Sequence, residues 1–251
     1  MLRWLILPLL FATPLCAGEE VVLGLSQDRV AITATFDGSE ILVFGAVKRE
    51  QAIPENEIDV IVTIAGPSQP VMVRRKEKRL GIWVNIEAVE IDSAPTFYAV
   101  ATSGPMHRVL SHIEDLRHKV SIPLAIRSVG APMEVEDAQS FTEALIRIRK
   151  ENQSYQLLED AVIVDQQTLF RTAITLPANL TEGDYATRIF LTREGTIVSE
   201  FDTVIKVDKV GLERWLFDLS RQQPLAYGLL SLFIAIAAGW SASAAFRIFR
   251  S

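Results

Sequence analysis

The stretch QQPLAYGLLSLFIAIAAGWSASAAF, residues 222–246, lies between Arg221 and Arg247 and contains no charged side chain. An α-helix rises about 1.5 Å per residue, so a helix over this stretch reaches roughly 37 Å. The hydrocarbon core of a bilayer is about 30 Å thick, which such a helix can cross. The residues before it are more polar and have strand-like patterns, so the sequence predicts a folded domain with a C-terminal transmembrane helix.

The ends of this stretch indicate how the helix is oriented. The tail, residues 247–251, carries Arg247 and Arg250 and no acidic residue, which favours the cytoplasmic side. Tyr227 and Trp240 lie near opposite ends of the helix, where amphipathic rings anchor in the two interfaces. These anchors predict a single-pass protein with its C-terminus in the cytoplasm and its larger domain across the membrane.

Small side chains recur along one face of the predicted helix, at Ser231, Ala235, Gly239 and Ser243. Small residues let two transmembrane helices approach closely, so this face predicts packing against another membrane protein. The alternative is that such residues are simply common in membrane helices. The lipid bilayer is a partner in both interpretations.

A shorter helix is predicted at residues 210–221, just before the transmembrane stretch. Leu212, Trp215, Leu216 and Leu219 fall on one helical face. With Trp215 as an interfacial anchor, this amphipathic helix would lie among the lipid headgroups. The alternative is that it packs against its own domain.

The first 18 residues have the layout of a secretory signal peptide. A positive start at Arg3 is followed by an apolar run too short to span a bilayer and by small residues at Ala17 and Gly18. Two alternatives remain: an uncleaved N-terminal anchor, and lipidation at Cys16, which the residues before it fit poorly. Cys16 is the only cysteine, so the mature chain would have no disulfide, thiol nucleophile or cysteine metal ligand.

Charge argues against one class of partner. The sequence has 25 basic and 31 acidic residues. Without Arg3, Arg247 and Arg250, which lie outside the exported part, the ectodomain carries 22 basic and 31 acidic residues, a net charge of −9. Nucleic acid binding requires basic surface that neutralises phosphates, so no nucleic acid partner is expected.

Two parts of the ectodomain, residues 19–103 and 161–209, show the period of two that is typical of strands. Residues 41–47 form a more fully apolar strand. Residues 183–185, Gly-Asp-Tyr, resemble the tyrosine corner of immunoglobulin-like sandwiches. The sequence therefore predicts a mainly β fold, an immunoglobulin-like antiparallel β-sandwich built as one unit or as two.

Residues 104–160 have helical rather than strand spacing. One helix is predicted from the apolar residues Val109, Ile113, Leu116 and Val120. A second helix is predicted to start at Ser140, where residues 140–143 match a capping box. Its apolar face would carry Phe141, Leu145 and Ile148.

The chain thus divides into consecutive segments. The predicted order is a signal peptide at 1–18, an N-terminal β-sandwich at 19–103, a helical connector at 104–160, a C-terminal β-sheet portion at 161–209, the amphipathic helix at 210–221, the transmembrane helix at 222–246 and a cytoplasmic tail at 247–251.

Several motifs occur in one order along nearly the whole chain. They are the apolar strand 41–47, Gly81-Ile82-Trp83-Val84-Asn85, Phe97-Tyr98, Gly183-Asp184-Tyr185, Val210-Gly211-Leu212-Glu213-Arg214, Gln223-Pro224-Leu225-Ala226-Tyr227-Gly228 and Gly239-Trp240. Together they resemble a family of alphaproteobacterial transmembrane proteins. The resemblance implies a bacterial inner membrane and a periplasmic ectodomain, and it implies no activity and no cofactor.

A search for metal and catalytic motifs is negative. His107, His112 and His118 lie close in sequence, but on one helix His107 and His118 would be about 16 Å apart and His112 would point elsewhere. No metal site and no cofactor are therefore expected. The sequence also lacks a nucleophile elbow, an HExxH motif, a Walker loop and a Rossmann fingerprint, so we name no catalytic residue and do not expect an enzyme.

Arg74, Arg75, Lys76, Lys78 and Arg79 form a basic cluster in an otherwise acidic domain. The cluster is predicted at a hairpin, where a charged strand edge prevents aggregation. The functional alternative is contact with anionic headgroups or with an acidic partner.

These observations favour a non-catalytic interaction or accessory factor for another membrane or envelope protein. One alternative is a periplasmic module that binds a small ligand or anion, with the basic cluster as its candidate site. A second alternative is a hydrolase without a recognisable motif. A solid apolar core between the sheets would favour the accessory factor, whereas a pocket lined by buried polar groups would favour the binding module.

Overall fold

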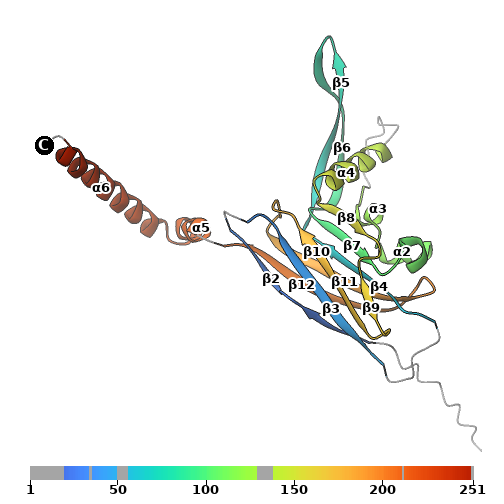
Figure 1. Ribbon diagram of the computed structural model, residues 1–251. Coiled ribbons are helices and arrows are strands. Elements are labelled where there is room, and N and C mark those ends of the chain that lie inside the picture. Colours follow the sequence, from blue (N-terminus) through green and yellow to red (C-terminus); the bar gives the residue numbers. More distant parts are fainter. Residues whose placement is uncertain (1–19, 34–35, 50–55, 129–137, 211, 250–251) are drawn as a thin grey trace, which may run out of the picture.

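The computed structural model describes residues 20–33, 36–49, 56–128, 138–210 and 212–249. Its main body is a β-sandwich of a four-stranded and a six-stranded sheet (Figure 1). The mainly β fold predicted from the sequence is confirmed. The predicted signal peptide at 1–18, including Cys16, lies outside the described residues.

The strands form two large sheets and a separate hairpin. The four-stranded sheet has the order β1-β3-β10-β9, with bounds β1 Glu20–Leu25, β3 Ser39–Lys48, β10 Leu169–Leu176 and β9 Ile163–Asp165. The six-stranded sheet has the order β2-β12-β11-β4-β7-β8, with bounds β2 Arg29–Ile32, β12 Thr196–Lys209, β11 Gly183–Arg193, β4 Asp59–Ala65, β7 Tyr98–Thr102 and β8 Tyr155–Leu158. The hairpin consists of β5 Ser68–Arg79 and β6 Ile82–Pro95.

Early and late parts of the chain contribute to both sheets. β3 pairs antiparallel with β10, and β4 pairs antiparallel with β11. Because neither half completes a sheet by itself, these strands form one sandwich rather than two.

Two pairings differ from the antiparallel arrangement that the sequence predicted. β2 lies parallel to β12, and β7 lies parallel to β8. Parallel neighbours need a long crossover between them, and for β7 and β8 the helices between residues 106 and 151 provide it. The alternation of apolar and polar residues does not show whether two neighbouring strands run parallel or antiparallel.

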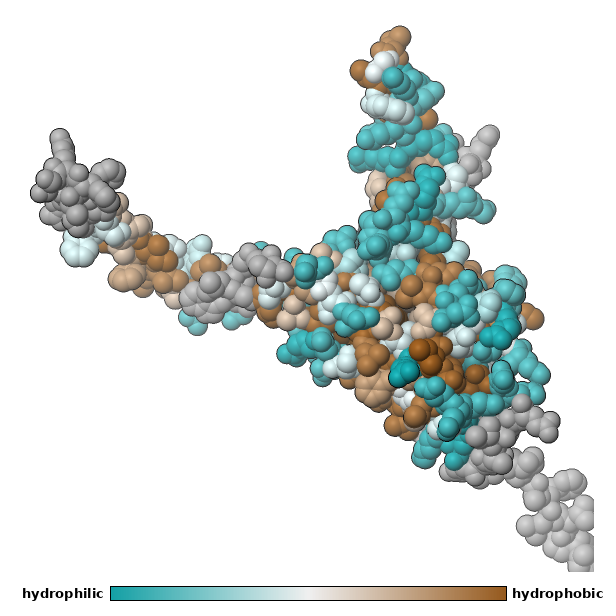
Figure 2. Space-filling model, viewed as in Figure 1, coloured by the Kyte–Doolittle hydropathy of each residue, from teal (hydrophilic) through white to brown (hydrophobic). Residues whose placement is uncertain are grey.

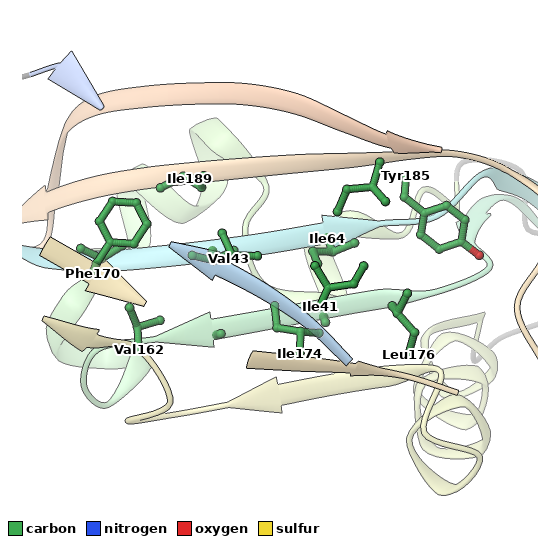
Figure 3. Packing of buried hydrophobic residues seen from close by; sticks show 14 of the residues in the cluster. Ile41, Val43, Ile64, Val162, Phe170, Ile174, Leu176, Tyr185 and Ile189 are labelled. Carbon is green, nitrogen blue, oxygen red and sulfur yellow. The ribbon is translucent and has the colours of Figure 1, made fainter. Parts of the chain in front are cut away.

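Alternation along the strands fills the space between the two large sheets. In β3, Ile41 and Val43 are fully buried, and their neighbours point to the other face. Ile174 from β10 and Ile189 from β11 belong to the same cluster (Figure 3). Full burial of one aliphatic side chain contributes about 1.5–3 kcal/mol, so this apolar layer is a main source of stability.

The tyrosine corner predicted at residues 183–185 is confirmed. Tyr185 is 1% exposed, and its hydroxyl donates a hydrogen bond to the carbonyl oxygen of Thr181 at 2.8 Å. Burial raises the pKa of the Tyr185 hydroxyl. This bond fixes the loop before β11 against the end of the sandwich.

Helices cover part of the outer face of the six-stranded sheet and build a second core there. Their bounds are α1 Met106–Val109, α2 His112–His118, α3 Ile122–Ala125 and α4 Ala138–Glu151. Ile61 and Phe190 are fully buried and share this core with Phe141 and Leu145 of α4. β4 is consequently buried on both of its faces.

The single helix predicted across α1 and α2 is wrong. After α1, Leu110 adopts an extended conformation with φ −141° and ψ 125°. Ser111 then starts a new helix, because its side chain accepts a hydrogen bond from the N–H of Glu114. The break turns Ile113, which the sequence placed on the buried face, into an exposed residue.

The predicted start of the second helix at Ser140 is also wrong. α4 already includes Ala138, and the Ser140 hydroxyl accepts a hydrogen bond from Nη2 of Arg75 at 2.6 Å. Phe141 is buried as predicted, whereas Ile148 is 50% exposed.

Candidate interaction surfaces and the membrane anchor

Two helices follow the sandwich, α5 Leu212–Gln222 and α6 Pro224–Phe249 (Figure 1). Within α6, Pro224–Ser243 is long and apolar enough to cross a bilayer, and none of it is buried. α6 starts at Pro224 rather than at residue 222, because proline suits the first position of a helix. The protein is therefore a membrane protein with one candidate C-terminal span.

The predicted packing residues of α6, Ser231, Ala235, Gly239 and Ser243, are all exposed. A Cβ added at Gly239 would meet nothing within 4 Å among the described residues. The Ser231 hydroxyl donates to the carbonyl oxygen of Tyr227 at 2.9 Å, so its polarity is satisfied inside the helix. This face of α6 therefore has only short side chains and is not covered by any other described residue, so a second helix could approach it closely.

The predicted interfacial anchors are only partly described. Tyr227 and Trp240 are 40% and 75% exposed on α6. A helix separates them by about 20 Å along its axis, so they fit two different depths of a bilayer. The side chains of Trp215 and Arg247, and the whole of Arg250, lie outside the part of the chain that the structure describes.

The hairpin of β5 and β6 projects away from the sandwich and turns at Leu80 and Gly81 (Figure 1). Its base belongs to the body, because Val73, Val89 and Ile91 are buried in the second core. The outer half is exposed, so the hairpin has a fixed base and a free end.

Arg75 of the predicted basic cluster holds the base of the hairpin to α4. Its guanidinium lies 2.9 Å from a carboxylate oxygen of Glu87, donates to the hydroxyl of Ser140, and lies over the Phe141 ring at 4.7 Å from the centroid. These contacts give Arg75 a structural role that its neighbours in sequence do not share.

Lys76, Lys78 and Arg79 lie toward the free end, and Arg74 lies at the base between Val73 and Arg75. Arg79 forms an ion pair with Glu77 at 3.0 Å. Arg74, Lys76 and Lys78 are exposed. Side chains leave a two-stranded ribbon in opposite directions, so these cations make a charged convex surface rather than a concave anion pocket.

The outer face of the four-stranded sheet carries exposed apolar side chains. Val22, Leu42, Phe44 and Leu169 are between 41% and 56% exposed. The register places Ala46 directly between Val22 of β1 and Leu169 of β10, so the exposed side chains lie on one face of three adjacent strands. We call these five residues the outer apolar face.

The three histidines lie on two short helices. His107 is in α1, and His112 and His118 are the first and last residues of α2. No group of three or more metal-ligating side chains occurs within the described residues. Nδ1 of His118 lies 3.1 Å from a carboxylate oxygen of Glu200, and Nε2 lies 3.6 Å from one of Glu114. His118 thus connects α2 with β12.

Tyr98 and Arg188 hold the same end of α2, and the sequence analysis named neither as a candidate site residue. The Tyr98 hydroxyl donates to the carbonyl oxygen of Val120 at 2.9 Å, and burial raises its pKa. The Arg188 guanidinium donates to the carbonyl oxygens of His118 and Lys119 at 2.8 and 3.2 Å. A lone arginine in an alternating strand looks solvent-facing in sequence, so no local signal identifies this role.

A β-sandwich that carries an exposed apolar helix at its C-terminal end indicates the class of membrane-anchored proteins, with one candidate span among the described residues. More particularly, the chain belongs to the family described as "Putative transmembrane protein (Alph_Pro_TM)", which it matches over residues 20–248. The family resemblance seen in the sequence motifs is therefore confirmed. No curated protein matches the chain.

One similar solved structure is the crystal structure of Spo0M, a sporulation control protein from Bacillus subtilis. The match has 11% sequence identity and a TM-score of 0.28, and it covers 82% of this chain and 55% of that chain. The chain thus spans about half the length of Spo0M. A similarity at this level supports no statement about function.

Proposed function

We propose that the protein is a non-catalytic accessory factor that binds another membrane protein through the outer apolar face. The exposed apolar side chains of Leu42 and Phe44 carry this proposal. The free face of an antiparallel sheet normally alternates to polar residues. Contiguous exposed apolar surface instead marks interaction sites.

The local geometry of Phe44 supports a surface adapted to contact. Gly24 of β1 pairs with Phe44, and the Phe44 ring occupies the space that a Cβ at Gly24 would need. The glycine therefore lets the ring pack against the backbone of β1. A partly exposed aromatic ring held in this way suits contact with another protein, because aromatic residues are enriched at interfaces.

The anchor indicates where the partner lies. A protein held by a membrane helix meets other proteins of that membrane at a high effective concentration. The exposed small residues of α6, Ser231 to Ser243, would allow a second transmembrane helix to pack closely. The partner proposed here is therefore a protein with its own span.

The orientation belongs to the same proposal. Removal of a signal peptide at 1–18 and cytoplasmic placement of Arg247 and Arg250 put the sandwich in the periplasm and α6 in the inner membrane. Leu216 and Phe217 of α5 are 38% and 58% exposed, which suits a helix on the outer headgroup layer. A fluorescent reporter fused after Ser251 should be active in the cytoplasm, and a periplasm-specific reporter there should be inactive; the reverse contradicts this orientation.

The test of the proposed function compares two exposed sites. Phe44→Glu places a charge on the outer apolar face, and Val198→Glu makes the same change at a 44% exposed residue of β12. We expect a heterologous membrane protein to co-purify with the wild type and with V198E at equal stoichiometry, and at least roughly tenfold less with F44E. Equal recovery with F44E, or recovery of a second copy of the chain as the only companion, contradicts the proposal.

A second candidate function rests on a cavity of about 280 Å³ beside α2 and α3. Its lining includes His118, Lys119, Arg127 and Arg188, and none of the described lining residues is acidic. Such a site suits a small anion. Calorimetric titration of inorganic phosphate into the full-length protein should give binding that Lys119→Gln with Arg127→Gln removes and Lys150→Gln does not. Absence of binding by the wild type rejects this candidate.

A further inference from the structure

The tip of the hairpin exposes large apolar side chains far from either core. Leu80 is fully exposed, and Ile82 and Trp83 are 65% and 68% exposed. Figure 2 shows apolar atoms at the apex of the hairpin above a largely hydrophilic stem. Nothing in the packing of the sandwich requires these side chains to be apolar.

The turn itself works against an apolar residue. Leu80 has φ 50° and Gly81 has φ 86°. Two-residue hairpin turns with positive φ favour asparagine, aspartate or glycine, because other side chains are strained there. A leucine kept in this conformation at a fully exposed tip indicates a function of the tip rather than a requirement of folding.

Positive charges lie next to the tip. In the strand register Lys78 stands opposite Trp83, and Arg79 stands opposite Ile82. Cross-strand partners share one face of a ribbon, so each face carries an apolar residue near the apex with a cation beside it. Lys76 continues the series toward the base. The chain as a whole has a net charge of −6, so this segment reverses the prevailing sign.

This order of side chains matches the surface of a bilayer. Tryptophan prefers the boundary between headgroups and hydrocarbon. Lysine and arginine are attracted to anionic headgroups, and leucine and isoleucine reach the first acyl carbons. A narrow convex ribbon offers little area to a folded protein, whereas lipid closes around it from all sides.

The hairpin and α6 extend from the same sandwich body (Figure 1). In Figure 1 the hairpin points upward from the sandwich, whereas α6 runs mainly to the left and only slightly upward. Because α6 anchors the sandwich to a bilayer, the exposed hairpin tip is kept at a high effective concentration near that bilayer surface.

We infer that residues 80–83 insert into the interface of the bilayer that α6 crosses, with Lys76, Lys78 and Arg79 on anionic phospholipid headgroups. The protein then has two membrane contacts, a permanent span and a reversible hairpin. Two contacts restrict rotation of the sandwich about its tether. The inference depends on the span and is independent of any protein partner.

The test places a single fluorophore at the tip. Trp4→Phe, Trp215→Phe and Trp240→Phe leave Trp83 as the only tryptophan of the full-length chain. The protein is reconstituted in vesicles with about one quarter phosphatidylglycerol and with phosphatidylcholine brominated near the headgroup end of its acyl chains. We expect roughly twofold or greater quenching of Trp83, because an interfacial indole lies at the depth of the bromines.

Matched variants test whether quenching of Trp83 results from insertion of the hairpin tip into an anionic bilayer. Lys76→Gln with Lys78→Gln and Arg79→Gln, or vesicles without phosphatidylglycerol, should lower the quenching by at least about half. A control tryptophan at the exposed sandwich position, Val198→Trp with Trp83→Phe, should not be quenched. Phe44→Glu should leave the quenching of Trp83 unchanged, so that failure of the protein-binding proposal does not affect this result.

Two outcomes overturn the inference. One is Trp83 emission in anionic vesicles that the brominated lipid does not quench. The other is shielding of Trp83 only in membranes that contain other native proteins, which would identify a protein as the occupant of the tip.

Discussion

The two large sheets both carry apolar side chains on their outer faces, but only one of these faces is covered by other described residues of the chain. Over β4, β7 and β11, the helices and the hairpin base bury Ile61, Val100 and Phe190 completely. Over β1, β3 and β10, Leu42 and Phe44 remain 41% and 43% exposed. An apolar strand face therefore indicates that other residues pack on it. It does not show whether those residues belong to the same chain or to another protein. The proposed function assigns the missing cover to another protein.

The largest expected difference between the two faces is in stability. Phe190→Ala should lower the free energy of unfolding by about 3–5 kcal/mol, because it removes a fully buried ring and leaves a cavity. Chemical denaturation of the purified full-length protein measures this change. A loss below about 1 kcal/mol would show that α1–α4 do not form a tightly packed cover.

A pH experiment tests the covered face without a large cavity. Tyr155 is 2% exposed under α4, its hydroxyl donates to the carbonyl oxygen of Pro95 at 2.8 Å, and burial raises its pKa from 10.0 to about 12. Below pH 10 both the folded and the unfolded states keep this hydroxyl neutral. Between about pH 10 and 12 only the unfolded state loses the proton, so stability should fall by up to about 2 kcal/mol.

Tyr155→Phe is the matched variant for this experiment. It should be less stable at pH 8, because the buried carbonyl of Pro95 loses its donor, by about 1 kcal/mol. It should also lose less stability than the wild type between pH 10 and 12. Parallel alkaline profiles of the two proteins would contradict the assignment of this titration to Tyr155.

The smallest effect is expected on the uncovered face. Phe44→Ser should lower the free energy of unfolding by only about 1 kcal/mol, since 43% of the Phe44 side chain is already exposed. The same denaturation measurement used for Phe190→Ala provides the direct comparison. A loss as large as that of Phe190→Ala would mean that Phe44 stabilises the fold and is not available to a partner.

Much of the fold is readable from local sequence. The strand period around Ile41 and Ile189, the Tyr185 corner and the uncharged stretch that forms α6 all follow from short-range patterns. The start of a new helix at Ser111 was missed, because continuous apolar spacing concealed a local cap.

The candidate surfaces were less predictable, because they depend on long-range packing. The fully apolar run 41–47 is compatible with a strand buried on both faces, and only the assembled sheet shows that Leu42 and Phe44 are exposed. The basic cluster was found by composition, but the hydrogen bond between Arg75 and Ser140 joins residues 65 positions apart. No local pattern encodes such a contact.

The central claim, that another protein covers the outer apolar face, is tested most directly by thiol accessibility. In a Cys16→Ser background the chain has no other cysteine, so Phe44→Cys and Val198→Cys each provide one reporter. We predict that a membrane-impermeant maleimide labels the cysteine at position 44 slowly in native membranes and rapidly after purification, while the cysteine at position 198 reacts rapidly in both. Equal and rapid labelling at position 44 in native membranes would contradict the account.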